Sequence, residues 1–222
     1  MTLDAALLRP LVLAAPSGTG KTTIVRHLVG GSDRFRFSVS ATTRPRRKRE
    51  RDGVDYHFLT PEAFEAMRES DELVEWAEVH GHMYGTPRRA LTEPASRGEQ
   101  VVLDIDVQGA RQIKKAMPEA ILVFILPPSV EVLVGRLRGR RTEQENEVLR
   151  RLVNAREELT EAVDFDFAVV NEHLDEAVAE VLDIASGGSG RPREVDAVAK
   201  DVARLRRGIG RMIAQEFTGE SI

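Results

Sequence analysis

The chain of 222 residues contains no cysteine. Disulfide bonds and thiolate metal sites are therefore excluded, and nothing in the composition points to an oxidising compartment. The first residues lack the basic start and apolar block of a secretory signal, and no apolar run approaches the ~20 residues that span a bilayer. We therefore expect a cytoplasmic protein with no membrane partner.

Positive charge is in slight deficit. The 32 lysines and arginines face 36 acidic residues, which gives a formal net charge of −4. A general nucleic-acid binder gains from an overall positive field, so no nucleic-acid partner is expected. Lysine itself is scarce, because 27 of the 32 basic residues are arginine. An isolated arginine therefore carries little functional information in this chain.

Short apolar runs alternate with stretches of helical periodicity, a pattern that predicts an α/β fold. The expected strands are 11–15, 36–41, 101–105, 120–126 and 166–170. Those at 101–105 and 120–126 contain continuous apolar runs, as strands buried on both faces of a parallel sheet should. The length allows one domain or two.

Between residues 54 and 86 the pattern changes to short, half-exposed strands. Three such strands are expected at 56–59, 73–76 and 83–84, with a helix started by Thr60-Pro61. This texture is typical of a small mixed insertion over the strand ends of a main sheet.

A second change of texture follows residue 136. The stretch 136–141 is dense in arginine and contains one glycine, which suggests a mobile flap. Thr142 and Glu145 have the spacing of a capping box, and they predict a helix that runs to about residue 162.

Residues 15–22, APSGTGKT, follow the apolar run 11–14 and open a helix expected to stop at Gly30-Gly31. In such a loop backbone N–H groups converge on phosphate, Lys21 reaches the β- and γ-phosphates, and the Thr22 hydroxyl ligates Mg²⁺. Ala15 replaces the usual first glycine, and the loop tolerates the added methyl group if φ is negative at this position. A glycine-rich turn without a ligand is the alternative. The residues predicted to bind triphosphate are Ala15, Pro16, Ser17, Gly18, Thr19, Gly20, Lys21, Thr22 and Thr23.

The stretch 38–47, SVSATTRPRR, follows an expected strand and places Arg44 and Arg47 three residues apart on a proline-fixed turn. Guanidinium forks match phosphate oxygens in pairs, so the two arginines suit a doubly charged monophosphate. A solvated charge run or a nucleic-acid patch remains the alternative.

A carboxylate at Glu75, near the hydroxyls of Tyr84 and Thr86, is suited to reading a purine edge. Guanine offers the N1–H and N2–H donors side by side, whereas adenine presents an acceptor at N1. A site built around such hydrogen bonds rejects analogues that lack the donors. Asp104 and Asp106 lie at the carboxyl end of a buried strand, where an open α/β sheet places its ligands, and one of them could hold Mg²⁺ through water.

Two further features have simpler interpretations. His80 and His82 lack a third metal ligand nearby, so a structural or solvent-exposed pair is favoured over a metal site. Trp76 could stack on a base, but packing in the core is at least as compatible with the sequence.

Together these motifs resemble the guanylate kinase family. The resemblance runs from about Pro10 to Ile184 and also includes DYHF, VEW, HGHMYGT, LDIDVQG, PPS at 127–129 and VVN at 169–171. It implies an α/β fold of the P-loop NTPase type, with a three-layer parallel-sheet core. It also implies a GMP-binding insertion at about 40–92 and an arginine-rich lid at about 136–155, in one domain over 1–185.

The implied reaction is the transfer of the γ-phosphoryl group of ATP to GMP, or to dGMP, with Mg²⁺ as cofactor. By resemblance, the implied GMP-binding residues are Ser40, Arg44, Arg47, Tyr56, Glu75, Tyr84, Thr86 and Asp106. The implied catalytic residues, including the lid arginines, are Lys21, Arg44, Arg136, Arg140 and Arg151. Asn171 matches a position on the adenine side, and Thr22 and Asp104 match the magnesium site, the latter through water.

Two departures and two rival functions accompany the resemblance. Ala15 replaces a glycine, and Arg141 stands where a glycine often follows the lid arginine. One rival is a related kinase for a sugar bisphosphate, which would not need Glu75, Tyr84 and Thr86 together. The other is an inactive domain that binds phosphorylated proteins, but such modules lose phosphate-loop residues that are present here.

Residues 186–222 have no counterpart in the family pattern. A flexible linker is expected at 186–190, followed by a helix with an apolar seam that Gly208 and Gly210 weaken at its far end. The seam could dock on its own domain, or the segment 191–217 could join a homodimer or higher oligomer. A regulatory or targeting module is the alternative.

Overall fold

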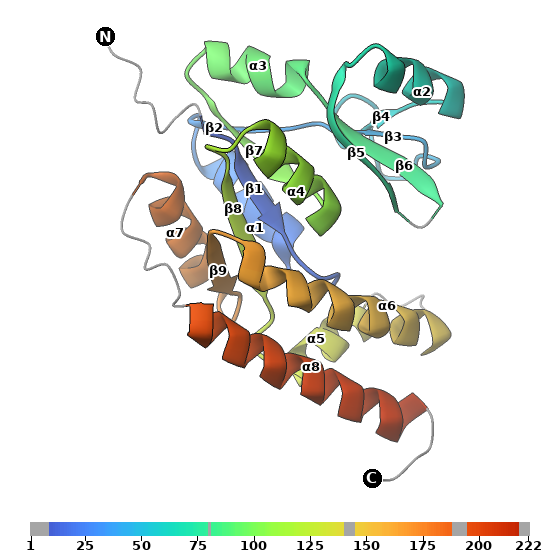
Figure 1. Cartoon of the computed structure of the whole chain (residues 1–222), viewed down its shortest axis with the longest axis vertical. Helices are drawn as coiled ribbons and strands as arrows, with labels where there is room; N and C mark the ends of the chain where they lie inside the picture. The colour runs from blue at the N-terminus through green and yellow to red at the C-terminus, as the bar shows by residue number, and fades with distance from the viewer. Residues whose placement is uncertain (1–8, 80, 140–144, 188–194, 218–222) are drawn as a thin grey trace. The chain divides into compact units, whose positions relative to one another are not determined.

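The computed structural model describes residues 9–79, 81–139, 145–187 and 195–217 (Figure 1). The chain divides into two compact units. Unit 1 comprises Met1–Val12 and Leu28–Ile121, and unit 2 comprises Leu13–His27 and Leu122–Ile222.

A five-stranded sheet has the order β2-β7-β1-β8-β9. Its strands are β1 (Leu11–Ala14), β2 (Phe35–Phe37), β7 (Gln100–Asp104), β8 (Ile121–Leu126) and β9 (Phe167–Val170). Within unit 1 β2 pairs with β7, and within unit 2 β8 pairs with β9, both in parallel. Every residue of β1 and β8 is buried, which explains their unbroken apolar sequences.

The strand expected at 36–41 is wrong in extent, because the chain leaves this sheet after Phe37. Ser38 still donates its N–H to the Val102 carbonyl at 2.9 Å. Ala41–Thr42 then forms β3 in a second sheet. The apolar pattern marks both pieces as extended but does not show that they belong to different sheets.

The second sheet, in unit 1, lies in the part of the chain where the sequence predicts short, half-exposed strands. It has the order β4-β3-β6-β5, where β4 is His57–Phe58, β5 is Leu73–Val79 and β6 is His82–Pro87. β3 pairs in parallel with β4 and antiparallel with β6. Helix α2 (Pro61–Glu69) begins at Thr60 as expected, and the Thr60 side chain accepts from the Ala63 N–H. Phe64 of α2 is buried with Ala41 and Leu73.

Two further helices complete unit 1. Helix α3 (Arg89–Ser96) precedes β7, and α4 (Val107–Ala116) follows it. The Asp106 side chain caps α4 by accepting the Gly109 N–H at 2.8 Å. The end of β7 and the start of α4 therefore form one short, hydrogen-bonded turn.

Unit 2 contains the loop after β1 and most of α1 (Lys21–Gly31). The helix was expected to stop at Gly30-Gly31, and these two glycines form its last turn. Unit 2 also contains α5 (Val130–Arg138), α6 (Glu145–Glu158) and α7 (Leu174–Ala185). The helix expected to reach residue 162 is α-helical only to Glu158, because a 3₁₀ segment, η2 (Leu159–Asp164), replaces its last turn. Thr142 and residues 140–141 of the expected flap lie outside the described residues.

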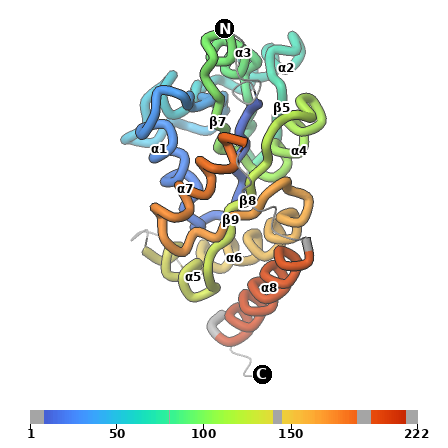
Figure 2. Tube along the Cα trace, turned by 90° about the vertical axis from the view of Figure 1, so that its left-hand side faces the viewer, coloured from blue at the N-terminus to red at the C-terminus, as the bar shows by residue number. Residues whose placement is uncertain are grey.

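Helix α8 (Val195–Phe217) continues through Gly208 and Gly210, so the predicted weak end remains helical. It runs beside α6 and contacts η2 and α5 of its own unit (Figures 1 and 2). Leu205 and Ile209 are buried, so this part of the apolar seam packs within unit 2. A Cβ at Gly208 would lie 2.7 Å from Val130 Cγ2, so glycine allows the close approach. Among the described helices, none is both long and apolar enough to cross a membrane.

Candidate active site

The phosphate loop lies in unit 2, between the end of β1 and the start of α1. Gly18 and Gly20 have φ values of +90° and +93°, which side-chain-bearing residues rarely adopt. A Cβ at Gly20 would also lie 2.4 Å from Asn171 Nδ2. Both glycines are therefore required by the backbone. In the described chain Asp71 is the one non-glycine residue with positive φ, so Ala15 has the negative φ that its methyl group needs.

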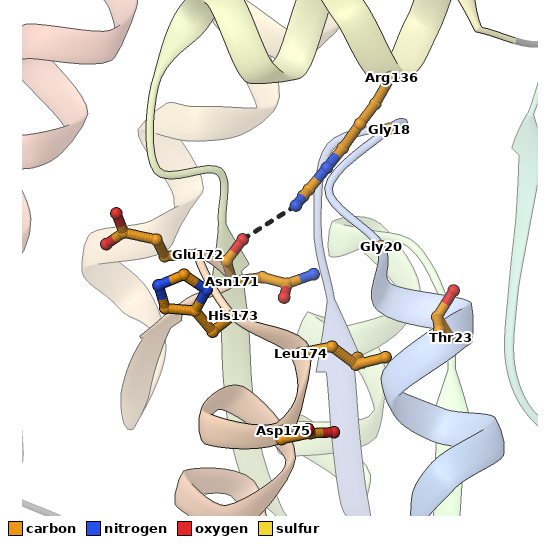
Figure 3. Close-up of a pocket in the computed structure, with 9 residues that line it drawn as sticks. All are labelled: Gly18, Gly20, Thr23, Arg136, Asn171, Glu172, His173, Leu174 and Asp175. Carbon is orange, nitrogen blue, oxygen red and sulfur yellow. Dashed lines mark hydrogen bonds between the residues drawn. The ribbon is translucent and has the colours of Figure 1, made fainter.

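Side chains from α5 and from the end of β9 hold the loop in shape. Asn171 Nδ2 and Arg136 Nη1 both donate to the Thr19 carbonyl, at 2.7 and 2.9 Å. Arg136 Nη2 also donates to the Asn171 carbonyl at 3.2 Å, the contact dashed in Figure 3. Arg151 of α6 bonds the Ser17 hydroxyl. Three residues predicted to act around the triphosphate thus converge on one loop.

A cavity of about 590 Å³ opens beside these contacts in unit 2 (Figure 3). This volume is in the range of small-molecule pockets. Asn171 is 4% exposed, and its Oδ1 finds no hydrogen-bond partner within the described part of the chain. The nine lining residues are Gly18, Gly20, Thr23, Arg136, Asn171, Glu172, His173, Leu174 and Asp175.

The sequence analysis missed the four lining residues from 172 to 175. They follow the VVN motif directly, and their proximity to Asn171 was the available signal. Lys21, at the start of α1, is half-buried, whereas Thr22 and Thr23 are exposed. Arg140 lies outside the described residues.

The candidate base-reading group, Glu75, lies on β5 in unit 1. Its side chain is 4% exposed, and Thr86 of the paired strand donates its hydroxyl to Glu75 Oε1 at 2.6 Å. Burial raises the pKa of Glu75 to about 7, assisted by the charge of Asp106 and opposed by the Thr86 hydrogen bond. The structure therefore brings Glu75, Thr86 and Asp106 together, three of the residues predicted to read the base. Ser40 is also buried, at the start of the second sheet.

This buried carboxyl predicts a specific dependence of stability on pH. The pKa is raised in the folded state, from an ordinary 4.5, so the folded chain retains a proton that the unfolded chain releases between pH 4.5 and 7. The associated stabilisation is complete at low pH and is lost as the pH rises through 7, by at most about 3 kcal/mol. Urea unfolding at pH 5 and pH 8 should show this loss in the wild type and not in Glu75→Gln. Equal pH dependence of the two proteins would contradict the assignment.

Arg44 and two tyrosines form the candidate phosphate clamp, also in unit 1. Arg44 Nε donates to the Tyr84 hydroxyl at 3.2 Å, and the guanidinium lies 5.4 Å from the centre of the Tyr56 ring. The two tyrosine rings meet edge to face at 5.9 Å. Burial, with the charge of Asp104, raises the pKa of Tyr56 to about 12, so its hydroxyl remains a proton donor at neutral pH.

Glu50 is a clamp residue that the sequence analysis did not identify. Its carboxylate pairs with Arg44 Nη2 at 2.8 Å and accepts the Arg47 backbone N–H at 2.8 Å. Burial alone would raise the pKa of Glu50, but these two contacts lower it, so the group is ionised. The Arg47 side chain is exposed. A carboxylate among six basic residues gave no sequence signal of this pairing.

The remaining predictions concern metals and Trp76. His80 lies outside the described residues, and within the described ones no three His, Asp or Glu side chains could hold a metal ion. The interpretation that Trp76 packs in the core is wrong, because its side chain is 39% exposed. The guanidinium of Arg68 lies 4.8 Å from the centre of its ring. The alternation along β5 buries Glu75 and therefore exposes the next residue.

A glycine-rich loop that joins a buried sheet strand to a helix, with arginines converging on it, defines a P-loop nucleotide-binding protein. The family model described as guanylate kinase matches residues 7–186. The chain belongs to the guanylate kinase family.

Relatives and a solved structure agree with this assignment. The guanylate kinase of Nitratidesulfovibrio vulgaris is 52% identical over 171 residues, which cover 77% of this chain and 83% of that protein. That of Syntrophotalea carbinolica is 50% identical over 173 residues, covering 78% and 82%. The crystal structure of guanylate kinase from Anaplasma phagocytophilum superimposes with a TM-score of 0.68 at 29% identity, covering 92% of this chain and 99% of that one.

Proposed function

We propose that this chain transfers the γ-phosphoryl group of ATP to GMP, giving ADP and GDP, and that it also accepts dGMP. The single observation that carries the guanine specificity is the buried Glu75 carboxyl, fixed by the Thr86 hydroxyl. The phosphate loop, with its two obligatory glycines, supports the triphosphate half of the reaction.

Glu75 reads guanine through its two oxygens. When ionised, a carboxylate accepts the N1–H and N2–H donors together, which adenine cannot provide. In this desolvated site the pairing is stronger than in water, and a buried carboxylate without a partner is energetically unfavourable. Thr86 orients the group, while Ser40 and Asp106 complete the base site.

The phosphate of GMP binds to a clamp of Arg44, Arg47, Tyr56 and Tyr84. Arg44 is positioned by its contacts with Tyr84 and Glu50, and the Tyr56 hydroxyl can donate to a phosphate oxygen. The positive charge of the two arginines screens the negative charge of the GMP phosphate. An oxygen of that phosphate can therefore approach the γ-phosphate of ATP, which is also an anion.

The triphosphate of ATP binds to the loop of residues 15–23, with Lys21 at the β- and γ-phosphates. Arg136 and Arg151 already contact the loop, and we propose that they act with Arg140 on the transferred group. Asn171 and the cavity next to it take the adenine side, since the unpaired Asn171 Oδ1 can accept a hydrogen bond from the adenine amino group.

Mg²⁺ is the proposed cofactor, and the available donors suit it. The Thr22 hydroxyl and the Asp104 carboxylate are hard oxygen ligands, and Mg²⁺ in kinases needs only one or two protein ligands beside phosphate and water. Bound there, the ion would neutralise charge on the β- and γ-phosphates. No protein nucleophile is needed, because positioning and charge neutralisation supply most of the rate in phosphoryl transfer.

The experiment that tests the function measures ADP formation with GMP, AMP, a ribose bisphosphate and no acceptor. We expect rapid turnover with GMP and little with the other three. Turnover with the bisphosphate would favour the sugar kinase, and no turnover with any acceptor would favour the inactive binding domain. In either of these cases the proposed function is wrong.

Location and assembly remain predictions. We propose a cytoplasmic enzyme without nucleic-acid or membrane partners, which self-associates through 191–217. Deleting residues 186–222 and measuring molecular mass and activity together would show whether this segment serves assembly or catalysis.

A further inference from the structure

Helix α4 contacts the base-reading strand through a glutamine that the sequence analysis did not single out. β5 is the outer strand of its sheet, with β6 on one side. On its other side Gln112 Nε2 donates to the Trp76 carbonyl at 2.7 Å, and Gln112 Oε1 accepts the Trp76 N–H at 3.2 Å. One side-chain amide thus bonds both polar groups of a single residue, as a neighbouring strand would. It fixes the backbone immediately after Glu75.

Gly109, one turn before Gln112 on the same helix, lies against the Glu75 carboxyl itself. A Cβ at position 109 would lie 2.7 Å from Glu75 Oε2 and 3.1 Å from Glu75 Cδ. The other carboxyl oxygen, Oε1, is bonded to Thr86. The carboxyl group therefore occupies a space bounded by a hydroxyl on one side and bare helix backbone on the other.

The backbone of α4 does not itself need glycine at this position. Gly109 is absent from the described glycines with positive φ, and it lies inside the helix, where alanine is the better helix former. The glycine therefore weakens the helix without any conformational benefit. What it provides is room for the Glu75 carboxyl.

We infer that Gly109 and Gln112 are positioning residues that together fix the Glu75 carboxyl for guanine recognition. The inference rests on the proposed function. Gly109 sets how close the carboxyl stands to α4, and Gln112 sets where β5 lies along the helix. Neither residue is assigned a contact with substrate, so both act through Glu75.

The first experiment is Gly109→Ala, with Gly30→Ala as its control. Both substitutions add one methyl group to a helical glycine, but nothing lies within 4 Å of a Cβ at Gly30. We expect KM for GMP to rise about 10- to 100-fold in Gly109→Ala, because the carboxyl must move. KM for ATP should remain that of the wild type, as in the control. A KM for GMP equal to that of Gly30→Ala would overturn the inference.

The second experiment is Gln112→Met, with Lys115→Met on the same helix as its control. The methionine keeps the length of the side chain but cannot bond the Trp76 backbone. We expect KM for GMP to rise about 3- to 10-fold, with kcat and KM for ATP unchanged. An equal change in both KM values would instead indicate a general structural role and overturn the assignment of Gln112.

A double variant separates positioning from simple loss of packing. In Glu75→Asp the side chain is one methylene shorter, and we expect its carboxyl to lie farther from position 109. Gly109→Ala should therefore change KM for GMP by less than about twofold in that background. The same factor in both backgrounds would overturn the inference. If the wild type does not phosphorylate GMP, the proposed function is wrong; if it does and Gly109→Ala behaves like wild type, only the present inference is wrong.

Discussion

Lys21→Ala should lower kcat by at least about 10³-fold while leaving the affinity for GMP unchanged. Lys21 begins α1 directly after Gly20, whose φ of +93° directs the loop into the helix. Its ammonium group is proposed to stabilise the charge that develops on the transferred phosphoryl. The proposed GMP residues all belong to unit 1, whereas Lys21 belongs to unit 2.

The measurement combines steady-state kinetics with calorimetric binding of GMP in the absence of ATP. Lys200→Ala, an exposed lysine on α8, removes the same charge outside the proposed site and should retain wild-type turnover. Near-normal turnover in Lys21→Ala would contradict the phosphate-loop assignment. A parallel loss of GMP affinity would show that Lys21 supports the fold rather than the reaction.

Glu75→Gln should raise the dissociation constant for GMP by about 10²- to 10³-fold and leave that for ATP unchanged. The amide retains one acceptor oxygen but turns an N–H₂ group toward a guanine donor, so one hydrogen bond is replaced by repulsion. Because Glu75 is only 4% exposed, water has little access to replace the lost hydrogen bond. Discrimination between GMP and AMP should fall by a similar factor.

The matched control is Glu78→Gln, which removes a carboxylate from an exposed position on the same strand. We expect its substrate constants to equal those of the wild type. If Glu75→Gln discriminates between GMP and AMP as well as this control does, guanine is read by other groups and the proposed role of Glu75 is wrong.

The phosphate loop could be predicted from the sequence because all of its determinants are contiguous. An apolar strand, two glycines and a helix start lie within residues 11–22, and the structure places them in that order. The Thr60 cap of α2 was predictable for the same reason. Such features depend on local backbone chemistry alone.

Features that depend on contacts between distant segments could not be predicted in the same way. Gln112 bonds a residue 36 positions earlier, and Gly109 makes room for a side chain on another element. Glu50 lies in a stretch of basic residues, and nothing in the sequence indicated that its carboxylate pairs with Arg44. Residue chemistry suggested Glu75 for the guanine base and Arg44 with Arg47 for the phosphate. Ser40, Tyr56 and Asp106 were added by resemblance to a family, because their spacing in the chain does not fix their geometry.

The boundaries of elements were also beyond the sequence pattern. Residues 36–41 read as one strand, because extended segments in two different sheets share the same alternation. The change from α6 to η2 after Glu158 leaves no mark in apolar periodicity, since both helix types can bury the same face. Gly208 suggested a weak helix but instead permits contact with Val130.

In the proposed reaction one chain moves a phosphoryl group from a triphosphate to a guanine monophosphate. The most direct test supplies ATP labelled in its γ-phosphate together with unlabelled GMP, and separates the products. We expect the label to appear in the β-phosphate of GDP, in amounts equal to the ADP formed. Label recovered as inorganic phosphate at the same rate with and without GMP would contradict it.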